Sequence, residues 1–493
     1  MKRRKFLHQS TVLGAAFYIV PSHAVAGLGH KPPSDKLHIA GIGVGGKGRW
    51  NLRAMESENI VALCDVDLAY SDPVFKNYPQ AARYTDWRKM FDKMRDNIDA
   101  VMIATPDHTH AVIAAHAMTL NYHVFCQKPL THSIYESRLL AQLARKYGVA
   151  TQMGNQGNSG HGVRQLCEWI WNGEIGEVTE AHAWTNRPLW PQGMDRPAEV
   201  MIIPDHLDWD GFLGPAPYRP YHTAYTPWNW RGWWDFGTGA FGDMACHVLD
   251  PIYQALRLDA PTSIQGNSSP MNAESAPQSE IVHFNFPARP GMDKVSMPPV
   301  TVHWYDGGLM PERPASLPDD QSLINDGMGG CMFIGSRDIL LCDTGGFNPR
   351  LLSGRIPEVQ ERLRRIPGAT GYIDGPHEQD WIRACKESTE NRIESSAHFG
   401  YSGPFNEMVL LGVLAIRLQR LERKLQWDSS RMTFTNIGPH EELEVAHSRE
   451  EIQNGVMQYR NELLRLPALD TTQTYIRREY RPGWSLPVKV VVD

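Results

Sequence analysis

The chain has 493 residues, of which 42% are hydrophobic and 21% charged, a composition typical of a globular protein with two or three domains. A formal net charge of −6 gives no basic field for a nucleic acid, so we expect no nucleic-acid partner. Seven cysteines, an odd number without a C-x-x-C pair, indicate neither a disulfide framework nor a zinc site.

Residues 1–26 are predicted to be an export signal of the twin-arginine type. Arg3-Arg4-Lys5-Phe6-Leu7 precedes an apolar run, Thr11 to Val20, that has about half the length of a membrane span. Ala24-Val25-Ala26 supplies a small-residue cleavage pattern. A general secretory signal with a chance arginine pair is the alternative. Because no lipobox cysteine follows, we expect a periplasmic protein without a stable membrane anchor.

Residues 36–155 are predicted to form a dinucleotide-binding Rossmann domain. A buried strand at Leu37–Ile42 runs into a G-x-G-x-x-G loop, and a helix starts at Arg49–Glu56. The loop glycines are Gly43, Gly45, Gly46 and Gly48. A second strand, Ile60–Cys64, ends at Asp65, whose carboxylate can accept the ribose hydroxyls and repel a 2′-phosphate. The pattern therefore favours NAD over NADP as the cofactor.

Strand and helix patterns continue to alternate after this unit. Strands are predicted at Ala100–Ala104 and His123–Cys126, and helices at Thr109–Leu120 and Ser133–Gly148. Alternation of this kind indicates a parallel sheet with helices on its faces.

Residues 156–493 are predicted to form a second domain of α+β type. From about Thr151 the sequence changes to aromatic-rich loops with many Pro and Gly residues, and Glu407–Leu425 is the one long helical pattern late in the chain. The chain is expected to be loop-rich from about Asp470. Its last residues, Val488–Val492, could form an edge strand or an oligomer contact.

Two motifs follow predicted strands at the sheet edge where open parallel sheets bind ligands. They are Thr105-Pro106-Asp107-His108-Thr109-His110 and Gln127-Lys128-Pro129-Leu130. Together with the glycine loop and the segments 173–178, 237–247 and 377–381, they resemble the glucose-fructose oxidoreductase/inositol dehydrogenase (Gfo/Idh/MocA) family, over about Leu37 to Arg417. The resemblance implies a Rossmann domain followed by an α/β domain with an open, mainly antiparallel sheet, and an active site between them.

The resemblance also implies catalytic roles for Lys128, Asp243 and His247. The lysine would lie between the substrate hydroxyl and the cofactor, stabilise a developing alkoxide and relay a proton. Gln127 departs from the family pattern, in which a Glu precedes the lysine. Asp243 and His247, four residues apart, share a helix face with Asp250, and His247 would accept a proton near the nicotinamide. Without the resemblance, a capping Asp and a hydrogen-bonded helical His would be the simpler interpretation.

The remaining cofactor contacts are predicted at the two strand ends. They are Thr105, Pro106, His108, His110, Gln127 and Lys128, in addition to the loop glycines and Asp65. The H-x-H spacing of His108 and His110 could indicate a metal, but no nearby carboxylate or thiolate pattern completes a site. We therefore predict no metal site and expect helix capping and cofactor contact from this turn.

Substrate contacts are predicted from polar and aromatic residues. Nine of the 15 tryptophans fall between Trp169 and Trp234, and flat aromatic faces stack on sugars, although ordinary packing or a subunit interface explains most of them equally well. The predicted substrate-binding residues are Asn155, Gln156, His161, Arg187, Trp230, Asp243 and His247.

The expected function is NAD-dependent oxidation or reduction of a sugar, polyol or glycoside by hydride transfer. A redox-neutral glycoside hydrolase or lyase that passes through a 3-keto intermediate is the main alternative, because the periplasm has no free NAD pool and the cofactor would have to be tightly held. A non-catalytic sugar-binding protein is the second alternative. We expect a homo-oligomer, either a dimer or a tetramer.

Overall fold

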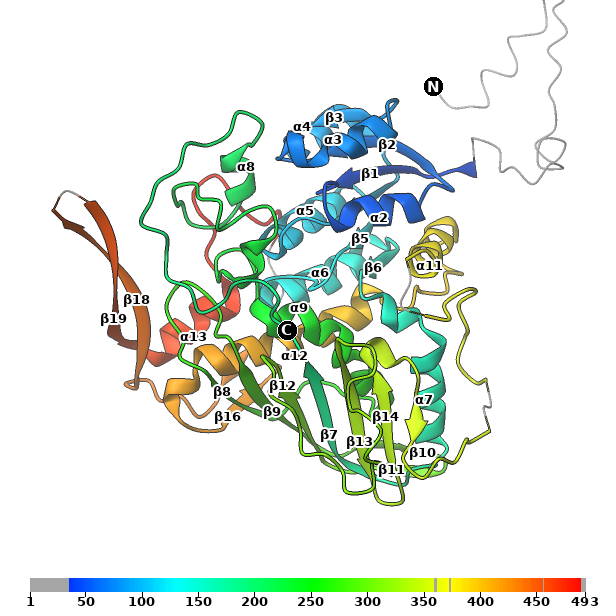
Figure 1. Ribbon diagram of the computed structural model, residues 1–493. Coiled ribbons are helices and arrows are strands. Elements are labelled where there is room, and N and C mark those ends of the chain that lie inside the picture. The colour runs from blue at the N-terminus through cyan, green and yellow to red at the C-terminus, as the bar shows by residue number, and fades with distance from the viewer. Residues whose placement is uncertain (1–34, 359–360, 372–373, 455, 489–493) are drawn as a thin grey trace, which may run out of the picture.

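The computed structural model describes residues 35–358, 361–371, 374–454 and 456–488 (Figure 1). The predicted export signal lies outside the described residues, as does nearly all of the predicted strand at Val488–Val492. Two sheets dominate the described chain, one at the top and one at the bottom of Figure 1, with helices between them.

The N-terminal sheet has six parallel strands in the order β3-β2-β1-β4-β5-β6. The strands are β1 (His38–Ile42), β2 (Asn59–Cys64), β3 (Ala82–Tyr84), β4 (Ala100–Ile103), β5 (His123–Cys126) and β6 (Thr151–Met153). The helices are α2 (Lys47–Ala54), α3 (Leu68–Asn77), α4 (Trp87–Met94), α5 (Asp107–Thr119) and α6 (Ile134–Tyr147), with a short 3-10 helix η3 (Arg95–Asn97). This strand order is that of a doubly wound Rossmann domain. The predicted Rossmann fold is confirmed.

The C-terminal sheet has nine strands in the order β15-β14-β13-β7-β12-β9-β8-β16-β17. The strands are β7 (Val178–Thr185), β8 (Ser263–Ser268), β9 (Glu280–Phe286), β12 (Val300–Tyr305), β13 (Gly329–Gly335), β14 (Ile339–Asp343), β15 (Arg350–Leu351), β16 (Leu425–Asp428) and β17 (Thr433–Phe434). Only β7 and β12 pair in parallel, so the sheet is mainly antiparallel, as expected.

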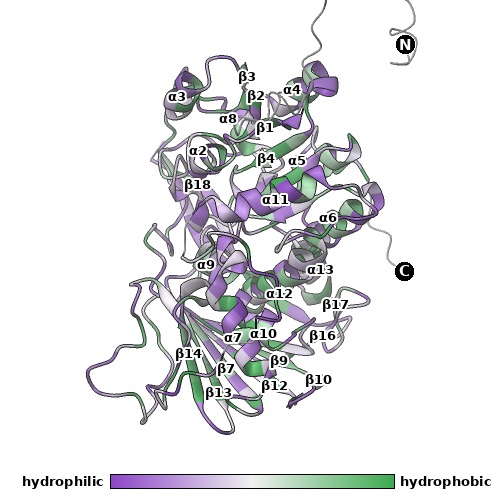
Figure 2. Cartoon of the chain, turned by 90° about the vertical axis from the view of Figure 1, so that its right-hand side faces the viewer, coloured by the Kyte–Doolittle hydropathy of each residue, from purple (hydrophilic) through white to green (hydrophobic). Residues whose placement is uncertain are grey.

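Two helices, α9 (Gly239–Val248) and α12 (Phe399–Arg417), lie between the two sheets (Figure 1). Ala181 on β7 and Val302 on β12 are buried in the core beneath these helices, whereas alternate residues on the same strands point to the opposite face. The strands therefore carry both hydrophobic and hydrophilic residues (Figure 2). Helix α12 has the length and apolar composition of a membrane span, but 83% of its most apolar window is buried inside the protein, as in a core helix.

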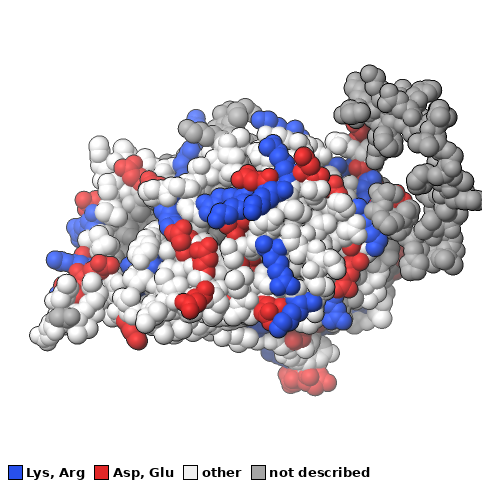
Figure 3. Space-filling model, turned by 90° about the horizontal axis from the view of Figure 1, so that it is seen from above, with Lys and Arg blue, Asp and Glu red and all other residues white. Residues whose placement is uncertain are grey.

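The remaining elements lie around these layers. They are η4 (Gln156–Ser159), α7 (His161–Trp171), α8 (Trp209–Leu213), η5 (Asn229–Gly232), α10 (Asp250–Ala255), η6 (Thr344–Gly346), α11 (Pro376–Lys386), η7 (Gln419–Leu421), α13 (Ala468–Arg477) and the hairpins β10 (Arg289–Met292)–β11 (Val295–Met297) and β18 (Glu442–Gln453)–β19 (Val456–Pro467). The second hairpin projects from the body in Figure 1. On the face seen from above, acidic and basic residues are intermixed (Figure 3).

Two sequence predictions for the C-terminal region are wrong. The helix expected at Glu407–Leu425 begins at Phe399 and ends at Arg417, because Glu422 adopts a left-handed φ of 50° and Leu425 pairs with β8 as a strand residue. The loop-rich end expected from Asp470 instead contains α13, whose buried Ala468, Thr472 and Ile476 repeat at helical spacing.

Candidate functional site

A cavity of about 580 Å³ is lined by residues of both domains. Its Rossmann wall includes Gly43, Gly46, Asp65, Thr105, Pro106, Gln127 and Lys128. Its C-terminal wall includes Gln156, Arg187, Trp190, Trp228, Trp230, Arg231, Asp243 and His247. The structure therefore brings most of the residues that were predicted for cofactor and substrate to one place. A cavity of this volume is in the range of small-molecule sites.

The glycine loop fits a dinucleotide by its shape. Gly43 has a φ of +76°, and a Cβ there would lie 2.7 Å from the carbonyl carbon of Ala104. A Cβ on Gly48 would lie 2.1 Å from the carbonyl oxygen of Gly43, so only glycine allows helix and strand to pack this closely. Among the described residues, no side chain caps the N-terminus of α2 at Gly46, which leaves its free amides for a pyrophosphate.

Asp65 holds the glycine loop in place. Its Oδ2 accepts hydrogen bonds from the amides of Val44 (2.8 Å) and Gly45 (3.0 Å), and its Oδ1 accepts one from the amide of Asp67 (3.0 Å). Burial raises the pKa of Asp65 to about 6, although these amides oppose the shift. Asp67, which caps α3 through the amides of Ala69 and Tyr70, also lines the cavity. Asp65 and Asp67 therefore both line the cavity.

Lys128, Asp243 and Arg231 form a charged cluster in the cavity wall. The Nζ of Lys128 donates to the Oδ1 of Asp243 at 2.9 Å and to its main-chain oxygen at 2.8 Å. The Nε of Arg231 donates to the same Oδ1 at 3.0 Å. Burial alone would raise the pKa of Asp243, but the two adjacent cations hold it at about 2. Asp243 is therefore an anion that positions both cations.

His247 lies one helical turn after Asp243 on α9 and lines the same cavity. Burial and the nearby Lys128 lower the pKa of His247 well below its usual value. The ring is therefore neutral near pH 7, with a nitrogen lone pair that can accept a hydrogen bond. Burial, together with the charge of Asp243, raises the pKa of Asp107 to about 7, and the Oδ2 of Asp107 accepts a hydrogen bond from Thr238 at 2.8 Å.

Gln127 belongs to a buried chain of three side chains. Its Nε2 donates to the Oδ1 of Asn51 at 2.9 Å, and the Nδ2 of Asn51 donates to the Oε1 of Glu378 at 2.7 Å. The Oε2 of Glu378 in turn accepts from the amide of Gly375 at 2.8 Å. The carboxylate that the family places beside the lysine is thus absent at Gln127, and Glu378 lies two hydrogen bonds away.

Aromatic rings surround Arg231 at the substrate end of the cavity. Its guanidinium carbon lies 4.0 Å from the ring centre of Trp228, 4.3 Å from that of Trp230 and 5.9 Å from that of Trp190. Trp230 also belongs, with Trp209 and Trp233, to a buried hydrophobic cluster. The tryptophan-rich segment therefore fits both interpretations, ligand contact and ordinary packing. Trp190, Trp228 and Trp230 line the cavity, whereas Trp209 and Trp233 only pack in the buried cluster.

His108 and His110 do not lie in the cavity lining, contrary to their prediction as cofactor contacts. The ring nitrogens of His108 face the carbonyl oxygens of Phe212 (3.0 Å) and Phe236 (3.2 Å), and those of His110 face Thr105 and Pro129 (both 2.8 Å). Burial lowers the pKa of His108 to about 3 and that of His110 to about 4, so each neutral ring donates to one carbonyl. Both histidines connect α5 to neighbouring backbone.

Asn155, His161 and Asp250 also lie outside the cavity lining. Asn155 is buried, and its amide atoms have no partner among the described residues. The Nε2 of His161 lies 2.9 Å from the carbonyl oxygen of Ile366. Asp250 begins α10 rather than extending the face of α9, and its carboxylate accepts hydrogen bonds from Asn158 and Tyr401. Gly45 and Gly48, which were predicted as cofactor contacts, are also outside the lining. A Cβ at either position would clash with neighbouring atoms, so they determine the shape of the loop.

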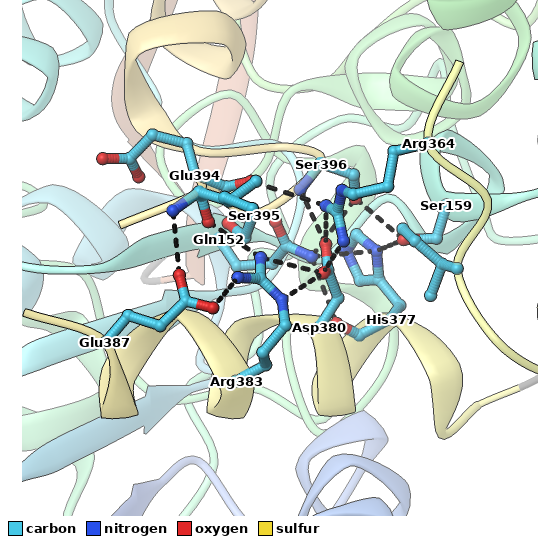
Figure 4. Close-up of polar contacts among 12 residues, drawn as sticks. Gln152, Ser159, Arg364, His377, Asp380, Arg383, Glu387, Glu394, Ser395 and Ser396 are labelled. Carbon is cyan, nitrogen blue, oxygen red and sulfur yellow. Dashed lines mark hydrogen bonds and ion pairs between the residues drawn. The ribbon is translucent and has the colours of Figure 1, made fainter. Parts of the chain in front are cut away.

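The segment around His377 belongs to a network of polar contacts between side chains (Figure 4). His377 contacts the hydroxyl of Ser159 at 2.6 Å and the carbonyl oxygen of Met153 at 2.7 Å. Arg364 and Arg383 converge on Asp380, at 2.7 and 3.1 Å. These contacts join α11 to η4 and β6, and they give the family-like segment 377–381 a supporting role.

Sequence reasoning missed one wall of the cavity. Trp484, late in the described chain, lines it and packs its ring 4.5 Å from the guanidinium carbon of Arg88. Arg481 anchors this segment through Asp210 at 2.6 Å, and Arg478 does so through the carbonyl oxygen of Asp235 at 2.9 Å. A Trp in a Pro- and Gly-containing tail, preceded by three arginines, was the available signal.

Comparisons with known proteins agree with this architecture. Residues 36–155 match the model of an oxidoreductase family with an NAD-binding Rossmann fold, and residues 167–284 match that of its C-terminal α/β domain. An inositol 2-dehydrogenase of Arthrobacter sp. (strain FB24) is 26% identical over 179 residues, which is 35% of this chain and 52% of the relative. A glycosyl hydrolase family 109 protein of Shewanella pealeana is 26% identical over 162 residues, or 31% and 36%.

Solved structures share the fold. An inositol dehydrogenase homologue from Azotobacter vinelandii, complexed with NADH and myo-inositol, aligns with a TM-score of 0.53 at 17% identity, over 80% of this chain and 98% of that one. The alignments span about a third to a half of the length of the curated relatives. Over residues 36–155 and 167–284, the chain is therefore similar to the NAD-binding oxidoreductases of the Gfo/Idh/MocA family.

Proposed function

We propose that the protein is an NAD-dependent enzyme that moves a hydride to or from a hydroxyl-bearing carbon of a sugar, polyol or glycoside. The observation that carries the proposal is the shared cavity: the glycine loop lies along one part of it, and Lys128, Asp243 and His247 lie along another. A nicotinamide cofactor bound there would supply the hydride acceptor. The chain's own residues would supply binding, orientation and proton transfer.

The residues divide the proton chemistry among themselves. Neutral His247 accepts the hydroxyl proton as the carbon–hydrogen bond breaks. Lys128 donates a hydrogen bond to the developing alkoxide, where a fixed positive charge is most effective. Asp243 stays ionised and orients Lys128 through its carboxylate and main-chain oxygens. Asp65 and Asp67 favour NAD over NADP, because both carboxylates would repel a 2′-phosphate.

A carbohydrate substrate is favoured by the wall opposite the glycine loop. Flat rings of Trp190, Trp228 and Trp230 stand beside the hydrogen-bond donors of Arg187 and Arg231. Aromatic faces match the C–H surface of a sugar ring, and guanidinium groups donate to its hydroxyls. The relative that acts on inositol supports the same class of ligand.

Redox-neutral cleavage of a glycoside is the second candidate, supported by the relative from glycosyl hydrolase family 109. In this cycle, oxidation at ring carbon 3 acidifies the hydrogen at carbon 2, and elimination expels the group at carbon 1. In a hydrolase, water then adds across the resulting double bond, and hydride return to carbon 3 resets the enzyme. It suits a protein exported through the twin-arginine route, as we propose for residues 1–26, because folded cargo can carry a bound cofactor out of the cytoplasm.

The decisive experiment starts with mass analysis of the purified protein for bound NAD, followed by product analysis on a glycoside panel without added cofactor. A substrate deuterated at carbon 3 should keep its label in a redox-neutral cycle while the hydrogen at carbon 2 exchanges with solvent. A dehydrogenase should pass the label to an acceptor and leave carbon 2 untouched. Failure to bind NAD, whether as isolated or after titration, would overturn both enzymatic proposals and leave the sugar-binding alternative.

A further inference from the structure

A row of three histidines crosses the face of the C-terminal sheet that points away from α9 and α12. His182 on β7 is directly opposite His303 on β12, and His303 is directly opposite His283 on β9. Their strand neighbours Ala181 and Val302 point into the core, so the three imidazoles share the opposite face. The rings of His182 and His303 stack with centres 4.9 Å apart.

Glu180 completes a compact group of metal-ligating atoms. It lies two residues before His182 on the same face of β7, and its Oε1 is 3.1 Å from the Nε2 of His182 and 3.3 Å from the Nε2 of His303. The three coordinating atoms all lie within 4.8 Å of one another. Zinc–ligand bonds of about 2.0–2.1 Å in a tetrahedron place neighbouring ligand atoms about 3.3 Å apart.

We propose that Glu180, His182 and His303 bind a divalent transition metal ion of the zinc class. Two imidazole nitrogens and one carboxylate oxygen form a set typical of zinc, whereas calcium and magnesium prefer oxygen ligands alone. Three protein ligands leave the fourth tetrahedral position for water. None of the three residues lines the cavity described above, so this site is separate from the proposed active site.

Outer contacts orient the two imidazoles for this role. The Nδ1 of His303 lies 2.7 Å from the Nδ1 of His283, and the Nδ1 of His182 lies 3.4 Å from the hydroxyl of Tyr305. When each Nδ1–H donates to its outer partner, each Nε2 presents a lone pair to the ion. His283 is therefore a positioning residue for His303. The sequence pattern did not reveal this group because its histidines come from three separate strands.

The test uses the full chain without a histidine tag, stripped with EDTA and titrated with Zn²⁺ by calorimetry. We expect one ion per chain and a higher melting temperature with Zn²⁺ present. His182→Ala, His303→Ala and Glu180→Gln should each weaken binding at least tenfold. His283→Ala should weaken it by about 10- to 100-fold while keeping the stoichiometry. His206→Ala is the matched control, because His206 pairs with a single carboxylate, Asp67, at 3.0 Å.

Substitution with Co²⁺ provides a readout that needs no variant. The wild-type chain should show the intense visible absorption of tetrahedral Co²⁺, and excess Zn²⁺ should abolish it. Wild-type protein that takes up no Zn²⁺, or that gives only the weak bands of hydrated Co²⁺, would overturn the proposal. Unchanged binding after His182→Ala and His303→Ala would overturn it equally.

Discussion

Lys128 donates two hydrogen bonds to Asp243, one to the carboxylate at 2.9 Å and one to the main-chain carbonyl at 2.8 Å. The lysine follows β5 of the Rossmann domain, and the aspartate lies on α9 of the C-terminal domain. The pair therefore links the two domains at the cavity and fixes the ammonium group in two directions. Arg231 shares the same carboxylate oxygen, which gives Asp243 two cations to position.

Asp243→Asn should lower turnover by about 10²-fold, because Lys128 loses its charged partner and small misplacements of a catalytic group are costly. NAD affinity should stay within a factor of about three, since the glycine loop is untouched. Steady-state kinetics and cofactor titration measure the two effects. Asp250→Asn is the matched control: Asp250 is buried near α9 but lies outside the cavity lining. Equal losses in both variants would contradict the assigned role.

Lys128→Met and His247→Ala should each reduce turnover by roughly 10²-fold or more, the scale expected when a positioned acid or base is removed. Both proteins should still retain NAD, so mass analysis of the bound cofactor separates catalysis from binding. Normal turnover of the true substrate by both variants would show that the active site has been misplaced.

Asp65→Ala should weaken NAD binding at least roughly tenfold, the effect of losing a carboxylate that accepts several hydrogen bonds. NADP binding should weaken too, because the carboxylate holds the loop through Val44 and Gly45, which both cofactors need. Fluorescence titration with each cofactor gives the two dissociation constants. If Asp65→Ala leaves NADP affinity unchanged or raises it, the ribose contact rather than the loop contact dominates.

Asp107 predicts a pH dependence of stability. Its pKa is raised by burial to about 7, above its unfolded value near 3.8, so its stabilising contribution is complete below about pH 4 and is lost as pH rises through 7. Between pH 4 and pH 8, the ionisation of Asp107 should lower the free energy of unfolding of the wild-type protein by a few kcal/mol. Asp107→Asn should abolish this decrease. Urea unfolding of both proteins at several pH values measures this difference. If the free energies of unfolding of the wild-type and Asp107→Asn proteins change in parallel with pH, Asp107 ionises normally. Asp72→Asn is the control, because Asp72 lies in an exposed ion pair with Lys76.

The chain from Gln127 through Asn51 to Glu378 has a fixed hydrogen-bond polarity, because Gln127 donates at one end and Glu378 accepts at the other. Gln127→Glu places acceptors at both ends and should lower the melting temperature by several degrees. The double variant Gln127→Glu/Glu378→Gln reverses the polarity, since Asn51 can turn its amide, and should recover most of the loss. Differential scanning calorimetry of the three proteins tests this, and additive losses would refute the coupling.

Short-range patterns in the sequence located much of the candidate site. Gly43 and Lys128 each follow a strand of a parallel sheet, and the carboxyl ends of such strands meet at one edge, so their proximity could be predicted without knowing the rest of the fold. The helical spacing of Asp243 and His247 placed them on one face in the same way.

Contacts between distant segments could not be predicted. Helical periodicity predicts a helix that contains His110 and begins directly after His108, but which carbonyl groups surround the two rings depends on Phe212, Phe236 and Pro129 from other segments. The row of His182, His303 and His283 depends on the strand order of the C-terminal sheet and on its register. Neither is encoded in a local motif.

Gly43 and Trp484 come from opposite parts of the described chain, yet both line the same cavity. During synthesis the glycine loop and its sheet leave the ribosome long before the segment that contains Trp484. A nascent chain that has released only the Rossmann domain therefore presents an incomplete cavity. The cavity that both segments line is therefore completed only when the end of the described chain has folded.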